Sequence, residues 1–410
     1  MSIIVSCNRG HNASTTLLVD GELIFYLEEE RLTRFKRDGT PLMGLAKVFD
    51  FVDYIDELVI CHTHREGPQS DWTGEDIYKS WIRKLSRGKF NFNVTCIDTI
   101  HHQMHGACGF IHSGFDTAAC VIADGAGSFL QSDAYDGCTL FEFETIFKAK
   151  KPLILEQVYK HLGTDKSVGF NVVDEDTGMH VTEHPGIAKA YEAVTRYCGF
   201  QSIDAGKLMG LSPYGKPNSN LPPIVRDGFV NRDLFMPNYP NGAYIICDRY
   251  PGVFSVEEET AQRGKQNGEY SENQKDLAYA VQEASEIYIG DLIQKAVDIT
   301  GEKNIVVSGG YGLNCVANYK FKKRFPDLNI FVEPISHDGG TSIGGAYTVY
   351  NDKYLEKKKE YFELKPQKTI YYGPQYNPVS YIHYISSLND DRIEVTDTSY
   401  DDVAKLIRSG

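Results

Sequence analysis

The sequence predicts an α/β protein in which one strand-hairpin unit occurs twice. Strand and helix patterns alternate through most of the chain, which is typical of this class. A unit of strand, polar turn with glycine, strand, Asp-Gly and strand opens the chain at Ile3. It returns from Ala118 as AACVIADGAGSFLQSDAYDGCTLFEFE. Two such units indicate a duplicated nucleotide-binding fold, although β-hairpins occur in any α/β protein and the repeat alone does not decide the fold.

The first half follows this plan element by element. An Asp-Gly pair at Asp20-Gly21 joins two apolar runs, which is a strong hairpin signal. The pattern predicts strands at 3–7, 15–20, 22–28, 57–61, 92–97 and 118–124, and helices at 42–52, 76–85 and 101–112.

The second half predicts longer helices and an interruption. Helical patterns cover 181–199 and 272–300, and residues 216–270, rich in Pro, Asn, Gly and Tyr, predict an irregular insertion. Two strands, at 304–308 and 329–333, each lead through a glycine loop into a helix. We expect one domain over 1–350, a charged linker over 351–368, and a new, incomplete unit of helix, strand (393–396) and helix over 369–410.

Composition restricts the function classes. Forty-two basic and 56 acidic residues give a net charge of −14, which disfavours non-specific nucleic-acid binding because phosphates require a basic face. No apolar run reaches membrane-spanning length, and the N-terminus lacks a signal-peptide pattern. Nine cysteines without a CxxC pair, mostly in apolar runs, indicate reduced thiols in a cytoplasmic protein.

Two histidines and two aspartates predict a metal site. His101 and His105, four residues apart on a predicted helix, lie on one face and can bind one cation. Asp124 ends a predicted strand, where α/β sites are built, and Asp338 lies in a polar glycine loop. Imidazole and carboxylate together suit iron, zinc or manganese. The alternative for an isolated HxxxH is a surface histidine cluster.

Two glycine loops predict anion binding. Gly309-Gly310 and Gly339-Gly340 each follow a strand and precede a helix, so their backbone N–H groups lie at a helix N-terminus. Neither is a Walker A or dinucleotide motif, and such loops are commonly tight turns. The turn at His11 and the charged run 28–36 follow hairpin strands that would point at the nucleotide.

Six ordered motifs resemble the O-carbamoyltransferases of the nodulation and antibiotic-tailoring type, whose N-terminal part has the actin-like ATPase fold shared with tRNA threonylcarbamoyl transferases. The resemblance therefore implies two α/β lobes around a nucleotide cleft. The motifs are HNAS followed by VDGEL, EEERLTRFK, HHQMH with DGAG, DAGKLMGLSPYGKP, SGGYGLNCVAN and PISHDGGTSIGGA. They span residues 1 to about 350.

The resemblance assigns roles position by position. It implies that His101, His105, Asp124 and Asp338 hold ferrous iron or another divalent metal, which contacts the phosphate of carbamoyl adenylate made from carbamoyl phosphate and ATP. His11 is the implied base beside the acceptor hydroxyl, and Lys36 an anion-stabilising residue. The implied nucleotide-binding residues are Gly309, Gly310 and Asn314, with Lys207 weaker and Gly339 and Gly340 added by their loop.

The sequence departs from the family at three places. Asn12 replaces the usual Asp, and His337 replaces the usual Gly before Asp338. The arginine-rich signature of the YrdC-like domain that makes carbamoyl adenylate is absent, so the resemblance implies a fragment or a split enzyme whose partner is a YrdC-like domain or chain.

Several readings stay open. The first is carbamoyl transfer to a hydroxyl of a small molecule or of a hydroxymethylated nucleotide or DNA base. Threonylcarbamoyl transfer to tRNA is the second, disfavoured by the acidic charge. A catalytically silent ATP-binding subunit is the third. A sugar-kinase-like enzyme would not need the paired histidines.

Overall fold

The computed structural model divides the chain into two compact units, Met1–Tyr372 and Gly373–Gly410. Each unit is described by itself. The structure describes residues 1–62, 77–132, 138–164, 171–174, 177–237, 242–255, 270–355, 369–374, 377–388, 390–394 and 396–409.

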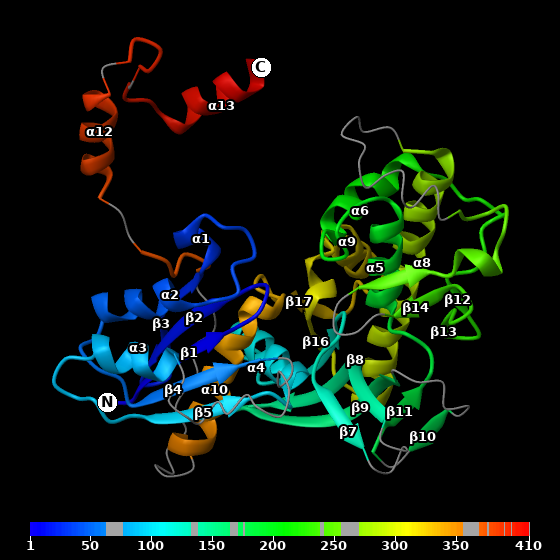
Figure 1. Cartoon of the computed structure of the whole chain (residues 1–410), viewed down its shortest axis with the longest axis horizontal. Helices are drawn as coiled ribbons and strands as arrows, with labels where there is room; N and C mark the ends of the chain where they lie inside the picture. Colours follow the sequence, from blue (N-terminus) through cyan, green and yellow to red (C-terminus); the bar gives the residue numbers. More distant parts are fainter. Residues whose placement is uncertain are drawn as a thin grey trace. The chain divides into compact units, whose positions relative to one another are not determined.

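A five-stranded sheet forms the first half of the larger unit (Figure 1). Its first three strands make an antiparallel meander, and the last two run parallel to β1. Asp20 and Gly21 both have positive φ, as the two-residue turn between β2 and β3 requires. In sheet order the strands are β3 (Glu22–Glu28), β2 (Ser14–Val19), β1 (Ile3–Asn8), β4 (Glu57–Cys61) and β5 (Asn93–Ile97).

The second sheet repeats this order. Its central strands run β9-β8-β6-β16-β17, with an antiparallel meander and two strands parallel to β6. This repeat defines the duplicated fold of actin-like ATPases, as predicted. Its strands are β6 (Thr117–Ala123), β7 (Phe129–Ser132), β8 (Cys138–Lys150), β9 (Ile154–Thr164), β10 (Val172–Asp174), β11 (Met179–Thr182), β16 (Asn304–Ser308) and β17 (Asn329–Val332).

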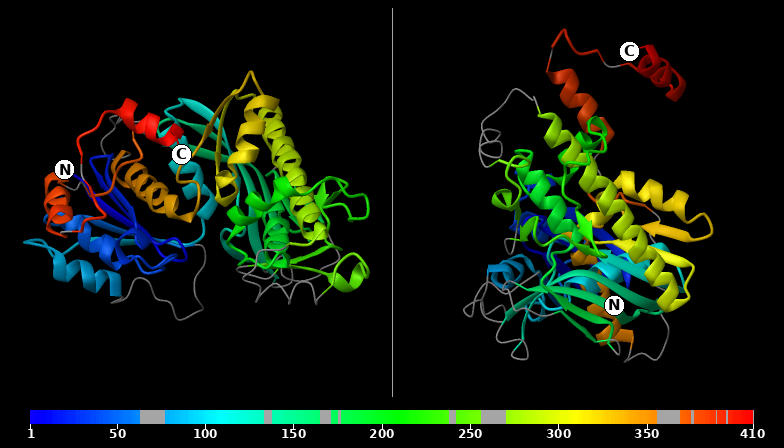
Figure 2. Two further views of the ribbon diagram at one scale, coloured as in Figure 1. Left: turned by 90° about the horizontal axis from the view of Figure 1, so that it is seen from above. Right: turned by 90° about the vertical axis from the view of Figure 1, so that its right-hand side faces the viewer.

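Two helices lie between the sheets. Helix α4 (His101–Ser113) follows the last strand of the first sheet, yet it packs on β6 and β16 of the second. Helix α10 (Thr341–Tyr350) follows the last strand of the second sheet and packs on β1, β2 and β4 of the first. The two helices also pack on each other, as the left view of Figure 2 shows. Each half is therefore covered by a helix of the other.

The outer faces carry the remaining helices. Helices on the first sheet enclose one apolar core, and α5 and α8 with their neighbours enclose a larger one on the second. The long α8 begins at a capping box of Ser271 and Gln274 and ends at Gly301 in the left-handed conformation. The helices are α1 (Glu30–Thr33), α2 (Leu42–Lys47), α3 (Ile77–Leu85), α5 (Ile187–Tyr197), α6 (Ala205–Leu211), α8 (Glu272–Thr300) and α9 (Cys315–Arg324).

Two expected elements differ from the structure. The helix predicted at 181–199 begins only at Ile187, because Pro185 and Gly186 precede it and β11 occupies 179–182. The described part of the 216–270 insertion contains two short antiparallel ribbons. These are β12 (Val225–Arg226) with β13 (Phe229–Val230), and β14 (Phe235–Pro237) with β15 (Ala243–Ile245).

The smaller unit contains two helices, α12 (Pro378–Ser387) and α13 (Tyr400–Ser409). The strand expected at 393–396 is wrong for the residues described there, which form no strand. The polar run between α12 and α13 contains Asp390 and Arg392, which pair with each other at the surface. Most of the predicted linker, and the second Asp-Gly pair at 136–137, lie outside the described residues.

Candidate metal and nucleotide site

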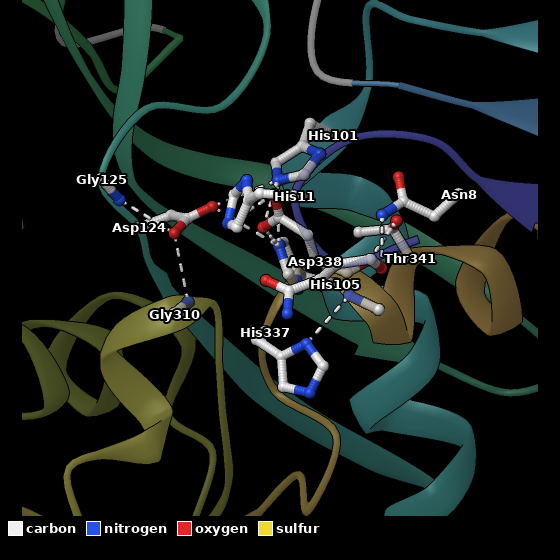
Figure 3. A network of polar contacts seen from close by, with 12 residues as sticks. Asn8, His11, His101, His105, Asp124, Gly125, Gly310, His337, Asp338 and Thr341 are labelled. Atoms are coloured by element: carbon white, nitrogen blue, oxygen red, sulfur yellow. Dashed lines mark hydrogen bonds and ion pairs between the residues drawn. The ribbon is translucent and has the colours of Figure 1, made fainter. Parts of the chain in front are cut away.

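Four side chains predicted to bind a metal converge between the two sheets (Figure 3). One ligand-type atom from each of His101, His105, Asp124 and Asp338 lies within 4.8 Å of the others. His101 Nε2 lies 3.1 Å from Asp124 Oδ2 and 3.6 Å from Asp338 Oδ1. The corresponding distances from His105 Nε2 are 3.6 and 3.8 Å. The structure thus brings together all four residues, from three separate parts of the chain.

The first turn of α4 presents both imidazoles to the cluster. His101 and His105 are fully buried, one helical turn apart, with ring centroids 4.6 Å apart. The backbone N–H of His101 donates to Ser128 Oγ at 3.0 Å, which fixes the start of the helix to the turn between β6 and β7. The surface-cluster alternative is therefore excluded, since neither histidine reaches solvent.

The two carboxylate oxygens of Asp124, directly after β6, have different partners. Oδ1 accepts hydrogen bonds from the backbone N–H groups of Gly125, at 2.8 Å, and Gly310, at 3.2 Å. Oδ2 faces the histidines. The backbone bonds therefore fix the direction of the carboxylate and leave one oxygen for the cluster.

The cluster is strongly coupled electrostatically. Burial alone would lower the pKa of His101, but hydrogen bonds and charges from Asp124 and Asp338 raise it to about 10. Burial would raise the pKa of Asp338, as would the nearby Asp124, but His101 and His11 lower it to about 2. The pKa of Asp124 is well below its usual range for the same reason, since both histidines outweigh its burial.

The donor set fits a divalent cation. The Nε2 atoms of His101 and His105 face each other at 3.0 Å, a contact in which at most one nitrogen can donate when the rings are neutral. Two carboxylates beside them supply two negative charges in the protein interior. Two imidazoles and two carboxylates are ligands that iron, zinc and manganese accept. A cation among these four atoms would satisfy both the nitrogens and the charges.

Hydroxyl groups of the first hairpin fix the loop that carries Asp338. Ser14 Oγ donates to the carbonyl oxygen of Gly339 at 2.7 Å, and Thr16 Oγ1 lies 2.7 Å from Ser342 Oγ. His337, which departs from the family pattern, accepts a hydrogen bond from the Gly339 N–H through Nδ1 and lies 3.4 Å from Glu28. These contacts position Asp338 from both sides.

His11 lies at the open side of the cluster. It sits in the turn between β1 and β2, with 40% of its side chain exposed, and its Nε2 is 3.8 Å from Asp338 Oδ2. Asp338 therefore faces the histidine pair with one oxygen and His11 with the other. Asn12 follows in the same turn, and its carbonyl oxygen accepts from the Asn8 side chain at 3.2 Å.

The predicted glycines are sterically required where they stand. Gly309 has φ of +88°, and a Cβ there would lie 2.3 Å from the carbonyl oxygen of Ala123. A Cβ on Gly310 would lie 2.8 Å from Asp124 Oδ1. At Gly339 it would meet His337 and Tyr26, and at Gly340 the carbonyl oxygen of Ile335. Both loops therefore pass close to the ligand-bearing residues, and no side chain fits between.

Three predicted residues lie outside the cluster. Asn314 is buried and caps α9, and its amide also pairs with Gln282. Lys36 is exposed in the turn after α1. Lys207, on α6, donates to Asp204 at 2.8 Å. Their roles at a nucleotide remain predictions.

Two buried or half-buried charged residues beside the loop of Asp124 were not predicted from the sequence. Lys189 on α5 is fully buried and pairs with Glu192 at 3.0 Å. A Cβ on Gly125 would lie 2.3 Å from Glu192 Oε1, so this pair adjoins the loop of Asp124. The pattern of α5 predicts a helix, but no motif marks these charges. A lysine at an apolar position of an amphipathic helix is the one signal that could have identified them.

A cavity of about 930 Å³ lies elsewhere in the second half. Its walls come from α8, from residues 217–229 of the insertion, and from Tyr159 on β9 and His180 on β11, and they include none of the predicted site residues. Tyr159, Tyr279 and Tyr288 are among its lining residues. These tyrosines of β9 and α8 therefore line a cavity that is separate from the metal cluster.

The nine cysteines are free, and seven of them are buried. Only Cys315 is exposed, and Cys96 is half-buried. Within the described ranges, none of the helices combines the length and apolar character needed to cross a bilayer.

Fold and cluster together define a protein of the actin-like ATPase class with a buried site of metal-ligand type between its lobes. The sequence model of the carbamoyltransferase N-terminus matches residues 68–347, so the chain belongs to this family.

Similar proteins of known sequence include longer chains. Nodulation protein NolNO of Sinorhizobium fredii is 25% identical over 385 residues, which cover 89% of this chain and 49% of the relative. The uncharacterized protein sll1178 of Synechocystis is 24% identical over 405 residues, or 89% and 59% of the two chains. The chain therefore spans about half the length of these curated relatives. Among solved structures, full-length HypF in its phosphate- and nucleotide-bound form matches with a TM-score of 0.46 at 12% identity, over 87% and 56% of the two chains.

Proposed function

We propose that this chain carries the acyl-transfer site of an O-carbamoyltransferase. The donor is carbamoyl adenylate, made from carbamoyl phosphate and ATP, and the acceptor is a hydroxyl group. The observation that carries the proposal is the four-residue cluster of His101, His105, Asp124 and Asp338 in a chain of the carbamoyltransferase family. His11 lies beside this cluster on its exposed side.

The proposed mechanism uses His11 as the general base. Carbamoyl adenylate is a mixed anhydride, so an acceptor oxygen attacks the carbamoyl carbon, the bond to the phosphate oxygen breaks, and AMP leaves with the electron pair. His11 takes the acceptor proton, and Asp338, 3.8 Å away, orients the imidazole and stabilises its protonated form. Because His11 is 40% exposed, an acceptor can approach it from solvent.

The leaving phosphate requires positive charge. A divalent ion bound by the two histidines and two aspartates would stabilise the phosphate charge as a Lewis acid. The glycine loops at 309–310 and 339–340 adjoin the metal-ligand cluster, and their N–H groups are proposed to bind the phosphate as well. In the structure, the Gly310 N–H donates to Asp124 and the Gly339 N–H donates to His337. Lys36 and Lys207 are proposed to approach the nucleotide when it binds. No covalent protein nucleophile is needed.

The donor synthesis is proposed to lie in a further domain. Residues 369–410 would begin a YrdC-like domain that makes carbamoyl adenylate, completed in the same protein or by a second chain. The larger unit can be tested without that domain if the adenylate is supplied preformed.

A transfer assay followed by mass spectrometry tests the proposal. The protein, loaded with ferrous iron, receives preformed carbamoyl adenylate and a panel of sugars, hydroxymethyl nucleosides and other hydroxylated acceptors. We expect one acceptor class to gain a carbamoyl group. His105→Ala should abolish this gain, and His11→Ala should reduce it by about 100-fold or more while the adenylate still binds.

The control is His180→Ala, because His180 lies on β11 beside the separate cavity. It should leave transfer unchanged. Equal transfer by wild type and His105→Ala would contradict the proposed site. Failure of the wild type to bind carbamoyl adenylate at all would overturn the carbamoyl-transfer assignment and favour a silent nucleotide-binding subunit.

A further inference from the structure

A second group of buried side chains with metal-ligand atoms lies further along α4. Cys108 and His112 are four residues apart on the helix, and Glu333 follows β17. Cys108 Sγ lies 3.7 Å from His112 Nδ1, and His112 Nδ1 lies 3.0 Å from Glu333 Oε2. One ligand atom from each residue lies within 4.8 Å of the other two. Sulfur, nitrogen and oxygen donors from two distant segments therefore meet at one point.

Close packing of α4 on the second sheet produces this meeting. A Cβ on Gly109 would lie 2.7 Å from Val306 and 3.6 Å from the Glu333 side chain, so the glycine lets the helix approach β16 and β17. Glu333 is fixed by its own backbone contacts. Its N–H donates to the Val307 carbonyl at 3.0 Å, and its Oε1 accepts from the Ile335 N–H at 3.0 Å. Oε2 is thereby directed at the cysteine and histidine.

The group is isolated from solvent. The side chains of His112 and Glu333 are 1% and 0% exposed, and Cys108 is 1% exposed. Burying a carboxylate to this extent is costly unless hydrogen bonds, a paired charge or a metal ion compensate it. A divalent cation bound by the Cys108 thiolate, the Glu333 carboxylate and a neutral His112 imidazole would give a group with no net charge. It would also give the buried cysteine sulfur a role as a ligand.

We propose that Cys108, His112 and Glu333 bind a divalent transition metal, for which zinc is the best match. Zinc binds sulfur at about 2.3 Å and nitrogen and oxygen at about 2.0–2.2 Å. At tetrahedral angles, these bond lengths place the sulfur and nitrogen ligands about 3.5 Å apart and the nitrogen and oxygen ligands about 3.3 Å apart. The observed separations are 3.7 and 3.0 Å. Mixed thiolate, imidazole and carboxylate donors are accepted by zinc.

Three protein ligands leave a fourth position for an oxygen donor. A water molecule held in the interior would complete a tetrahedron. Because solvent does not reach the group, the site has a structural role, in contrast to the cluster beside the exposed His11.

The site would join two segments that carry ligands of the first cluster. Helix α4 contains His101 and His105 as well as Cys108 and His112. Glu333 begins the loop that leads to Asp338. A metal between them would hold this loop on the helix, so the second site would set the geometry of the first. The inference does not depend on the proposed activity.

Cobalt substitution tests the site on the full chain. Metal-free protein is titrated with Co²⁺, and the near-ultraviolet thiolate-to-cobalt charge-transfer absorption is recorded. The first cluster contains no sulfur and cannot produce this absorption, so the wild type should show it only if a cysteine binds. Cys108→Ser should lose the band, whereas Cys120→Ser, at a buried cysteine of β6, should keep it.

Metal content provides the second measurement. Cys108→Ser should bind one equivalent of zinc less than the wild type, because the second site is lost. His105→Ala should also bind one equivalent less, because the first cluster is lost, and it should keep the cobalt band. Glu333→Gln, which keeps the cysteine and the shape of the side chain, should weaken cobalt binding by at least about 10-fold if Cys108→Ser does not fold. A wild type that binds cobalt without the charge-transfer band, or a band that persists in Cys108→Ser, would overturn the proposal and leave a hydrogen-bonded buried pair.

Discussion

Gly309 illustrates how a single residue without a side chain determines the candidate site. Its φ of +88° and the closeness of the Ala123 carbonyl both exclude a Cβ. The next N–H along the chain, at Gly310, is one of the two that hold Asp124. Any displacement of this loop therefore changes the direction of a predicted metal ligand.

We expect Gly309→Ala to destabilise the protein more than Gly301→Ala. Both positions have positive φ, so each substitution costs roughly 1–2 kcal/mol of backbone strain. Only Gly309 adds a collision, since nothing lies within 4 Å of a Cβ at Gly301. The extra cost of that collision is about 1–3 kcal/mol. Urea unfolding of the two variants measures the difference, and equal losses would contradict the steric argument.

Glu142 on β8 should make stability depend on acid. Burial would raise its pKa, but the charge of His102, the ion pair with Lys160 and the hydrogen bond from the Ser128 N–H lower it from the ordinary 4.5 to about 2. Its stabilising contribution is complete above about pH 4.5 and is lost as the pH falls towards about 2, because the unfolded chain takes up the proton first. The contribution is at most roughly 3 kcal/mol, because burial lowers the pKa of His102 to about 3 and this ring carries little charge above that pH.

Glu142→Gln should therefore flatten the dependence of the unfolding free energy on pH between about pH 5 and about pH 3. Urea denaturation at several pH values measures this slope. Asp50→Asn, at an exposed position, serves as the control and should keep the slope of the wild type. The prediction is wrong if Glu142→Gln and wild type lose stability in parallel.

At the scale of elements, a contact between α1 and α6 connects the two halves. Arg37, in the turn after α1, donates to Gln201 at 2.6 Å and pairs with Asp204 directly before α6. Asp204 also accepts from Lys207. Burial would raise the pKa of Asp204, but Lys207 and Arg37 lower it. The residue that follows the EEERLTRFK motif thus contacts the first residue of the DAGKLMGLSPYGKP motif.

Arg37→Met should lower the free energy of unfolding by about 1–3 kcal/mol, because it leaves Asp204 with one partner fewer at a largely buried position. Arg324→Met is the matched control. Arg324 pairs with Asp291 at the surface, where such a pair contributes at most about 1 kcal/mol. Thermal unfolding of both variants measures the two losses of stability. Equal losses would show that the Arg37 contact contributes no more than a surface ion pair.

The sequence predicts the ligand residues well and their surroundings poorly. Residue type and spacing indicate His101 and His105, because helical periodicity is local, and the end of a strand indicates Asp124. The hydroxyl contacts of Ser14 with Gly339 and the approach of Glu333 to His112 join residues more than 200 positions apart. No local pattern encodes such pairs, since the fold itself brings them together. The sequence pattern starts the α5 helix too early, because its apolar periodicity continues into the preceding strand.

At the scale of the whole molecule, the larger unit should be stable alone. Helix α13 of the smaller unit buries none of its residues, and Leu406 and Ile407 are 68% and 78% exposed. A chain ending after Pro374 should unfold within about 2 °C of the full chain, because the apolar cores of the larger unit contain no residue beyond Tyr372. Calorimetry compares the two. A drop of 10 °C or so would show that residues 375–410 stabilise the larger unit.

The exchange of α4 and α10 between the sheets has an evolutionary consequence. A protein consisting of one half alone would leave its sheet uncovered unless a second copy lent its last helix, so the single-half ancestor would have been an obligate symmetric dimer. His101 begins α4, and Asp338 begins the short 3-10 turn, Asp338–Gly340, that leads into α10. Fusion of the two copies would have allowed these two segments to diverge, one towards histidine and the other towards aspartate. The asymmetric cluster between the sheets would then lie on the former dimer axis.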